Sequence, residues 1–334
     1  MTRAFSSLGI LGRQVHKDDP RRLVLIAALL VLLGVIFPAY LGIELTRGLR
    51  LAPGSTYGAG MSWAGLMESF NRQGFELAEG AERTEAPLLV PRVFVAELPH
   101  DWRDLNDPGQ RKRVFTTVLL PLVLRANEIL FERRSRLLEV MAQSRKGARI
   151  SARDRAWLLA LAEGYDVEAT EVTDKLLIKL KGMVDIVPPS LAIAQAAIES
   201  GWGTSRFAAE GNALYGQWAE EGEGAMVPAE RDAGRTYAIK SFDSLQDSVL
   251  AYMHNLNTHR AYRAFRAARA KMREKDRRIA GDALARHLGA YSERGERYIR
   301  DLNAIMSQNG LAVLDGAALR ARPGKELVTT SGPV

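Results

Sequence analysis

The residue of this sequence best suited to acid–base chemistry is Glu199, which ends a nearly continuous apolar run. Two prolines and Ser190 predict a helix start before that run, and Gly201 predicts its end, because glycine adopts left-handed dihedrals. Since the residues between are apolar on nearly every face, the helix should be buried. Burial and the negative end of the helix dipole both disfavour an ionised Glu199, so we expect its pKa to be raised. A protonated carboxyl of this kind is what a glycosidase uses as its general acid.

The alternative interpretation of Glu199 is a buried carboxylate satisfied by an arginine, and the surrounding motif favours catalysis. Four segments of the sequence are distinctive: Ala-Gln-Ala-Ala-Ile-Glu-Ser-Gly-Trp-Gly-Thr-Ser (194–205), Gly-Asn-Ala-Leu-Tyr-Gly-Gln-Trp (211–218), Tyr-Met-His-Asn-Leu-Asn-Thr (252–258) and Tyr-Ser-Glu-Arg-Gly (291–295). They resemble the glucosaminidases of glycoside hydrolase family 73, a family related to a flagellar muramidase domain. The last two segments are similar to the Bax-like members in particular, and the resemblance spans residues 91–311.

The resemblance implies a mainly helical (α+β) fold, with a lysozyme-like helical core and a small β-hairpin lobe. It also implies a peptidoglycan hydrolase: an endo-β-N-acetylglucosaminidase that cleaves the glycan strand after N-acetylglucosamine, with Glu199 as general acid. Two other functions remain open. A lytic transglycosylase or muramidase cleaves after the muramic sugar and can work with a single glutamate. A non-catalytic, cell-wall-binding regulatory protein would keep the cleft without the reaction.

A second catalytic group is required unless the substrate assists. An inverting enzyme places its two carboxyls about 6.5–9.5 Å apart, and a retaining enzyme about 5 Å apart. We rank Glu223 and Glu230 first, although solvated charge is the ordinary role of either. Alternatively, the 2-acetamido group of the substrate attacks the anomeric carbon, and the resemblance implies that Tyr291 orients it or positions water; otherwise Tyr291 is a core residue. The acidic residues of the expected lobe are Glu220, Glu221, Glu223, Glu230 and Asp232.

Aromatic and amide side chains near Glu199 in the sequence are candidates for binding sugar. Aromatic faces stack on sugar rings, and amides hydrogen-bond hydroxyl or acetamido groups. At least one of the aromatic rings is expected to belong to the core instead, and Gln195, one helical turn before Glu199, favours a structural hydrogen bond. The candidates are Gln195, Trp202, Asn212, Tyr215, Gln217 and Trp218.

The composition excludes several other kinds of site. The 334 residues include no cysteine, so disulfides and thiolate metal sites are absent, and the five-residue spacing of His254 and His259 does not place both on one helical face for a metal. We therefore expect no metal and no cofactor. The net charge of +7 suits an acidic polymer. The basic run at 263–278 lacks the interleaved aromatics of a nucleic-acid site, so we expect peptidoglycan as the partner of a monomer, and no nucleic acid.

The N-terminal region predicts a membrane anchor. Residues 23–43 carry no charge and are long enough to cross about 30 Å of hydrocarbon. The basic pair at 21–22 predicts a cytoplasmic N-terminus and an exported remainder, hence a single-pass protein of the bacterial inner membrane with its catalytic domain in the periplasm. A cleaved signal peptide is the alternative. The expected regions are a cytoplasmic segment (1–22), a signal anchor (23–43), a stalk (44–86), the catalytic domain (87–312) and a flexible tail (313–334).

Within the catalytic domain, periodicity and capping residues predict a series of helices around one β-lobe. We expect a helix after Asp104 or Asp107 to break near Pro121, and a cap at Asp243-Ser244. The other expected elements are an extended segment at 93–95, helices at 151–163, 172–184, 190–200, 261–278 and 297–307, one beginning at Asp282, and the lobe at 212–240.

Overall fold

The computed structural model describes residues 56–57, 60–77, 87–220, 222, 224–227 and 237–321. The chain divides into the units Met1–Gly48 and Leu49–Val334, and every described residue belongs to the second. The predicted membrane anchor, Glu223 and Glu230 lie outside the described residues.

The helices are α3 (Trp63–Arg72), α4 (Pro108–Arg145), α5 (Ala152–Glu163), α6 (Asp174–Met183), α7 (Pro189–Ser200), α8 (Arg206–Gly211), α9 (Leu245–Thr258), α10 (Arg263–Glu274), α11 (Gly281–Ala285) and α12 (Glu296–Gln308). Short 3₁₀ helices are η2 (Trp102–Asp104), η3 (Arg260–Tyr262), η4 (Gly289–Tyr291) and η5 (Leu311–Gly316).

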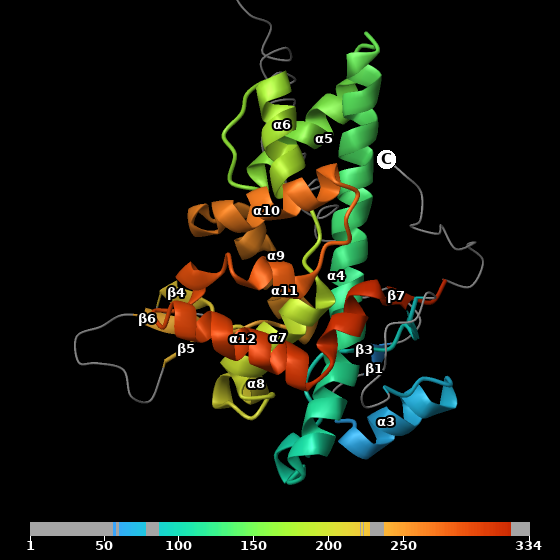
Figure 1. Cartoon of the computed structure of the whole chain (residues 1–334), viewed down its shortest axis with the longest axis vertical. Helices are drawn as coiled ribbons and strands as arrows, with labels where there is room; N and C mark the ends of the chain where they lie inside the picture. The colour runs from blue at the N-terminus through green and yellow to red at the C-terminus, as the bar shows by residue number, and fades with distance from the viewer. Residues whose placement is uncertain are drawn as a thin grey trace, which may run out of the picture. The chain divides into compact units, whose positions relative to one another are not determined.

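The long helix α4 packs against α6, α7 and α9 along its length, while α11 and α12 pack on α7 (Figure 1). Asp107 caps its first turn, as expected, by accepting from the backbone amide of Gln110. The prediction of a break at Pro121 is wrong, because α4 runs through it without interruption. Every residue from 114 to 127 is buried, so packing on all sides outweighs the roughly 3 kcal/mol that an internal proline costs a helix.

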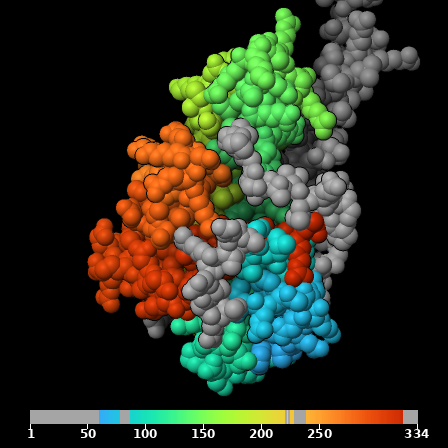
Figure 2. All heavy atoms as spheres, turned by 45° about the vertical axis from the view of Figure 1, so that its right-hand side comes forward, coloured from blue at the N-terminus to red at the C-terminus, as the bar shows by residue number. Residues whose placement is uncertain are grey.

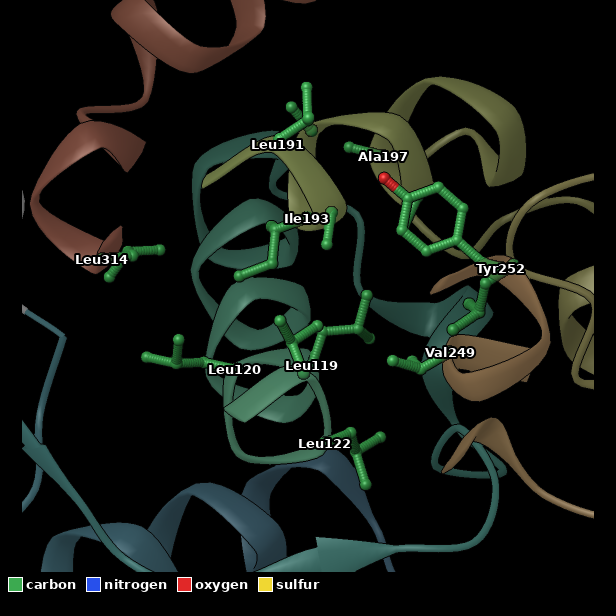
Figure 3. Packing of buried hydrophobic residues seen from close by; sticks show 14 of the residues in the cluster. Leu119, Leu120, Leu122, Leu191, Ile193, Ala197, Val249, Tyr252 and Leu314 are labelled. Atoms are coloured by element: carbon green, nitrogen blue, oxygen red, sulfur yellow. The ribbon is translucent and has the colours of Figure 1, made fainter. Parts of the chain in front are cut away.

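The main hydrophobic core lies where α7 and α9 meet the first half of α4 (Figure 3). Leu119 and Leu122 of α4 face Ile193 of α7 and Val249 of α9. This explains why α7 is apolar on nearly every face: neighbouring elements cover it all round. The prediction that the helix carrying Glu199 is buried is confirmed.

Helix α4 is also the one described helix with the length and composition to cross a membrane. Its most apolar window is 89% buried inside the protein, which is typical of the core helix of a folded domain. We therefore interpret α4 as the core of the catalytic domain, and the sequence-based prediction of an anchor concerns residues 23–43, outside the described part.

A second hydrophobic cluster joins α5 and α6 to the last part of α4 (Figure 1). It is centred on Leu137 of α4, Leu158 of α5 and Leu180 of α6. Ser151 and Thr173 cap α5 and α6: their side-chain oxygens accept from the backbone amides of Asp154 and Leu176. This cluster is separate from the main core, and α4 contributes residues to both.

A buried ion-pair cluster lies between α4, α10 and the segment that leads into α7. The side chain of Asp185, only 3% exposed, pairs with Arg273 at 2.8 Å, Arg134 at 3.4 Å and Arg269 at 3.9 Å. Burial would raise the pKa of Asp185, but the charge of Arg269, the hydrogen bond from Arg273 and the charge of Arg134 together hold it below the usual value. The carboxylate is therefore ionised, and it links three segments far apart in the sequence.

The start of α7 depends on a residue near the C-terminal end of the described chain. The sequence suggested that Ser190 caps the helix with its side chain, but it does not. Its backbone amide instead donates to Asp315 Oδ1 at 2.9 Å. The other oxygen of Asp315 accepts from the amide of Gly281, the first residue of α11, also at 2.9 Å. One carboxylate thus satisfies the first turn of two helices.

Folded elements occur on both sides of residues 87–312, the range expected for the catalytic domain. Residues 313–319 were expected in a flexible tail, but strand β7 (Ala318–Leu319) pairs in parallel with β2 (Leu89–Val90), and the last described residues lie against this region in Figure 2. The expected stalk contains α3, whose Leu66 and Phe70 are buried in the main core, and β1 (Thr56–Tyr57), which pairs with β3 (Phe94–Val95). The apolar face of α3 is buried there, so this part of the region is folded.

The lobe after α8 is a small antiparallel sheet, which confirms its predicted type. Strand β6 (Tyr237–Lys240) lies between β4 (Trp218–Glu220) and β5 (Ala225–Met226). The lobe joins the helical body closely at Gly211, where a Cβ atom would come within 2.4 Å of the sulfur of Met226. A helical body with one small three-stranded lobe matches the mainly helical fold expected from the sequence.

Candidate active site

Glu199 is the penultimate residue of α7, and the chain turns sharply straight after it. Gly201, Trp202 and Gly203 are three consecutive residues with positive φ, at 59°, 57° and 81°. Ser200 stabilises the turn: its hydroxyl donates to the carbonyl of Ala196 and accepts from the amide of Gly203. A Cβ atom at Gly203 would lie 2.7 Å from Nε1 of Trp102, so glycine is required there for both conformation and space.

The carboxyl of Glu199 is half-buried and favours its protonated form. Burial raises its pKa above the ordinary value, while a hydrogen bond from Tyr298 and the positive charge of Arg294 lower it by less. The expected direction of the pKa shift is therefore confirmed. A side chain that keeps its proton and is still partly open to solvent can donate that proton to a bound molecule.

A group of five tyrosines lies beside Glu199, and four of them interact with its charge: Tyr252, Tyr262, Tyr291 and Tyr298. Tyr252 stacks on Tyr215 with ring centroids 3.9 Å apart, and Tyr291 stacks on Tyr298 at 5.7 Å. The ring centroid of Tyr262 lies 6.0 Å from that of Tyr291, and Tyr262 is the fifth tyrosine of the group. Burial raises the pKa of each of the five hydroxyls, so all of them remain neutral hydrogen-bonding groups.

Gln195 lies one turn before Glu199 and is fully buried. Its Oε1 accepts from the hydroxyl of Tyr252 at 2.7 Å, and its Nε2 donates to the hydroxyl of Tyr298 at 2.9 Å. Tyr298 in turn is hydrogen-bonded to Glu199. Gln195 therefore holds the structural hydrogen bonds that its position suggested, and no atom of it is open to a sugar.

The three aromatic residues expected to bind sugar occupy different environments. Trp202 is half-buried and turns toward α4, where its ring meets Phe115 edge-on at 5.7 Å. Tyr215 is 2% exposed, and one face of its ring is covered by Tyr252. Trp218, on the first strand of the lobe, is 67% exposed and presents the large accessible ring of the three.

The segment between α8 and the lobe lies against Glu199. Gly216, with φ at 61°, is so close that a Cβ atom there would lie 3.8 Å from Oε2 of Glu199. Asn212 ends α8 in a left-handed conformation and donates to the carbonyl of Phe242, and the half-buried Gln217 follows Gly216. Tyr291 closes this wall by donating to the carbonyl of Tyr215 at 3.2 Å. Of the residues predicted from sequence, Gln195, Tyr215, Tyr291 and the 212–217 segment thus gather around Glu199.

No second carboxylate acts on Glu199 among the described residues; the charge that reaches it is that of Arg294. The two preferred candidates, Glu223 and Glu230, belong to parts of the lobe outside the description. The described residues also contain no cluster of histidine and acidic side chains suited to a metal ion. The described part of the site is therefore one carboxyl with a raised pKa beside a group of tyrosines.

Four residues of this site were not singled out from the sequence: Tyr252, Tyr262, Tyr298 and Arg294. Tyr252 and Arg294 fall inside the segments that carry the family resemblance, and that was the only signal available for them. Tyr298 falls outside those segments, on the buried face of α12, and its spacing there is that of any core residue. Only the packing of α12 against α7 brings it to Glu199.

Comparisons with known proteins indicate the family of this chain. A glucosaminidase family model, described as mannosyl-glycoprotein endo-beta-N-acetylglucosaminidase, matches residues 175–311. Protein bax from Escherichia coli strain K12 is 34% identical over 210 residues, which cover 63% of this chain and 73% of bax. The catalytic domain of the autolysin Auto from Listeria monocytogenes is 18% identical and covers 52% of this chain and 96% of its own, with a TM-score of 0.30 that is too low to support further comparison. The family model and the similarity to bax show that this chain belongs to the Bax-like glucosaminidases of glycoside hydrolase family 73.

Proposed function

We propose that this protein is a peptidoglycan hydrolase, an endo-β-N-acetylglucosaminidase that cleaves the glycan strand after N-acetylglucosamine. The observation that carries the proposal is Glu199, a half-buried carboxyl with a raised pKa at the centre of the family motif. Family membership supports glycoside hydrolysis, and the net charge of +7 suits a carboxylate-bearing wall polymer.

In the proposed reaction, Glu199 gives its proton to the glycosidic oxygen as the bond from that oxygen to the anomeric carbon breaks. Positive charge develops on the sugar ring, and water completes the hydrolysis. The second group is either Glu223 or Glu230 of the lobe, or the 2-acetamido group of the substrate, oriented by Tyr291. The exposed ring of Trp218 offers a face for a sugar at the edge of the lobe.

Mass spectrometry of digested peptidoglycan tests the bond that is cleaved. We expect the full-length protein, purified in detergent, to release fragments with reducing N-acetylglucosamine ends, and Glu199→Gln to release none. Reducing muramic ends would identify a muramidase, and 1,6-anhydro muramic ends a lytic transglycosylase. No fragments from the wild-type protein would favour the non-catalytic, wall-binding role.

We also propose that residues 23–43 anchor the protein in the inner membrane and leave the catalytic domain in the periplasm as a monomer. The uncharged run and the basic pair at 21–22 support this arrangement. We expect the protein to stay with membranes after an alkaline carbonate wash, and protease added to spheroplasts to digest all but a short N-terminal piece. Release of the intact domain into the soluble periplasmic fraction would instead indicate a cleaved signal peptide.

A further inference from the structure

We propose that Tyr298, held by Gln195, is a positioning residue that determines which oxygen of Glu199 carries the catalytic proton. The inference rests on the proposed role of Glu199 as general acid. It adds a hydrogen-bonded chain through the protein core, from α9 through α7 to α12, that ends at this carboxyl.

The chain has three links with defined ends. The hydroxyl of Tyr252 donates to Oε1 of Gln195 at 2.7 Å, and Nε2 of Gln195 donates to the hydroxyl oxygen of Tyr298 at 2.9 Å. At the third link, the hydroxyl of Tyr298 lies beside the carboxyl of Glu199 and affects its pKa. Tyr252, Gln195 and Tyr298, the three residues that lead to Glu199 in this series of hydrogen bonds, are each no more than 1% exposed. Water therefore does not compete for these bonds.

The amide of Gln195 and the pKa of Glu199 together indicate the direction of the last link. An amide oxygen only accepts and an amide nitrogen only donates, so Gln195 fills one acceptor position on Tyr298. The hydrogen bond with Tyr298 lowers the pKa of Glu199, which is the effect of a hydroxyl proton that points at Glu199. In a neutral carboxyl, the oxygen that accepts this bond is the one without the proton. The acidic proton therefore resides on the other oxygen, which is free to turn toward the substrate.

The surroundings hold this arrangement in place. The Tyr298 ring is stacked on Tyr291, with an angle of 8° between the planes, and the guanidinium of Arg294 lies 5.9 Å from the ring centroid of Tyr298. Arg294 is itself held by Asp301 at 2.7 Å. Gly216 borders Glu199 without a side chain, which leaves room beside the carboxyl. Tyr298 is thus held in place beside Glu199 by its neighbours, and Gly216, which also borders the carboxyl, has no side chain to compete with it.

Hydrogen bonds of this kind also serve merely to satisfy buried polar groups, and the pH profile separates the two roles. Tyr298→Phe removes the donor that stabilises ionised Glu199. We expect the basic limb of kcat/KM to move to higher pH, because Glu199 then keeps its proton longer. We also expect kcat at the optimum to fall by about tenfold with KM unchanged, since proton transfer loses its orientation.

Tyr165→Phe is the matched control. Tyr165 is buried to a similar degree in the cluster of α5 and α6, where its hydroxyl is bonded to Arg133. It is expected to change thermal stability alone. Tyr252→Phe, which removes the first link, should move the limb in the same direction by a smaller amount, and it provides the test if Tyr298→Phe does not fold.

A carbon-13 NMR titration of the Glu199 carboxyl gives the same information without substrate. It is expected to show a higher pKa in Tyr298→Phe, whether or not the protein cleaves glycan, so failure of this inference is distinguishable from failure of the proposed function. An unchanged titration in Tyr298→Phe would reduce Tyr298 to a structural residue and overturn the inference. A shift to lower pH would overturn it as well, because Tyr298 would then be accepting the proton of Glu199.

Discussion

Replacing Glu199 with glutamine is expected to lower the rate of glycan cleavage by about 10²–10⁴-fold, the range that a general acid contributes. Glutamine keeps the size of the side chain and an acceptor for Tyr298, but it has no proton to give to the leaving oxygen. Binding of glycan should persist, since the walls of the site are unchanged. Rates of fragment release and retention on insoluble peptidoglycan, measured side by side, check both expectations.

Glu163→Gln is the matched control, because Glu163 also lies in the last turn of a helix but is exposed. It should leave cleavage unchanged.

Thermal stability gives a second distinction between Glu199→Gln and the wild type. The folded protein holds the proton of Glu199 to higher pH than the unfolded chain does, so this group lowers stability as pH rises through its raised pKa. Glu199→Gln should therefore be at least as stable as the wild type at neutral pH. Unchanged fragment release would remove Glu199 from the reaction.

The features that could be predicted from sequence are those that depend on residues only a few positions apart. The helix carrying Glu199 ends at Gly201, with φ at 59°, because no other residue type fits that position as well. Caps at Asp107 and Ser244 were identifiable for the same reason: each accepts from an amide three residues on. The raised pKa of Glu199 also followed locally, from a carboxyl placed at the end of an apolar helix.

Features that depend on distant contacts could not be predicted. Ser190 looked like a cap, but the carboxylate that meets its amide belongs to Asp315, 125 residues later. Pro121 looked like a helix break, yet burial on every side carries α4 through it. Tyr298 and Glu199 are brought together only by the packing of α12 on α7. No pattern of period or spacing in the sequence encodes these contacts, because each is decided by which elements meet in space.

Replacing Asp185 with asparagine is expected to lower the free energy of unfolding by about 3–5 kcal/mol, the usual result of removing one partner from a buried ion pair. Asparagine has the same shape but no charge. It would leave Arg134 and Arg269 buried, with side chains 9% and 1% exposed, without their carboxylate. Denaturant titration of the unit Leu49–Val334 at neutral pH measures the change.

Asp154→Asn supplies the comparison, because Asp154 pairs with Arg136 at a similar distance, 3.0 Å, but in a more exposed position. Its loss should cost less than about 1 kcal/mol. An effect of Asp185→Asn no larger than that of Asp154→Asn would contradict the prediction for the buried cluster.

The pH dependence of the Asp185→Asn effect has a definite sign. The pKa of Asp185 is held below its usual value in the folded protein, so its contribution to stability is present above the unfolded pKa, about 3.9, and is lost as pH falls through the folded pKa. The gap between wild type and Asp185→Asn should therefore be widest near neutral pH and narrow in acid. Among the described residues, none of the four groups in the cluster acts on Glu199, so glycan cleavage per folded molecule should be unchanged. Stability and catalysis would then be separable in this domain, because the charges that hold its segments together are not those that shift the pKa of Glu199.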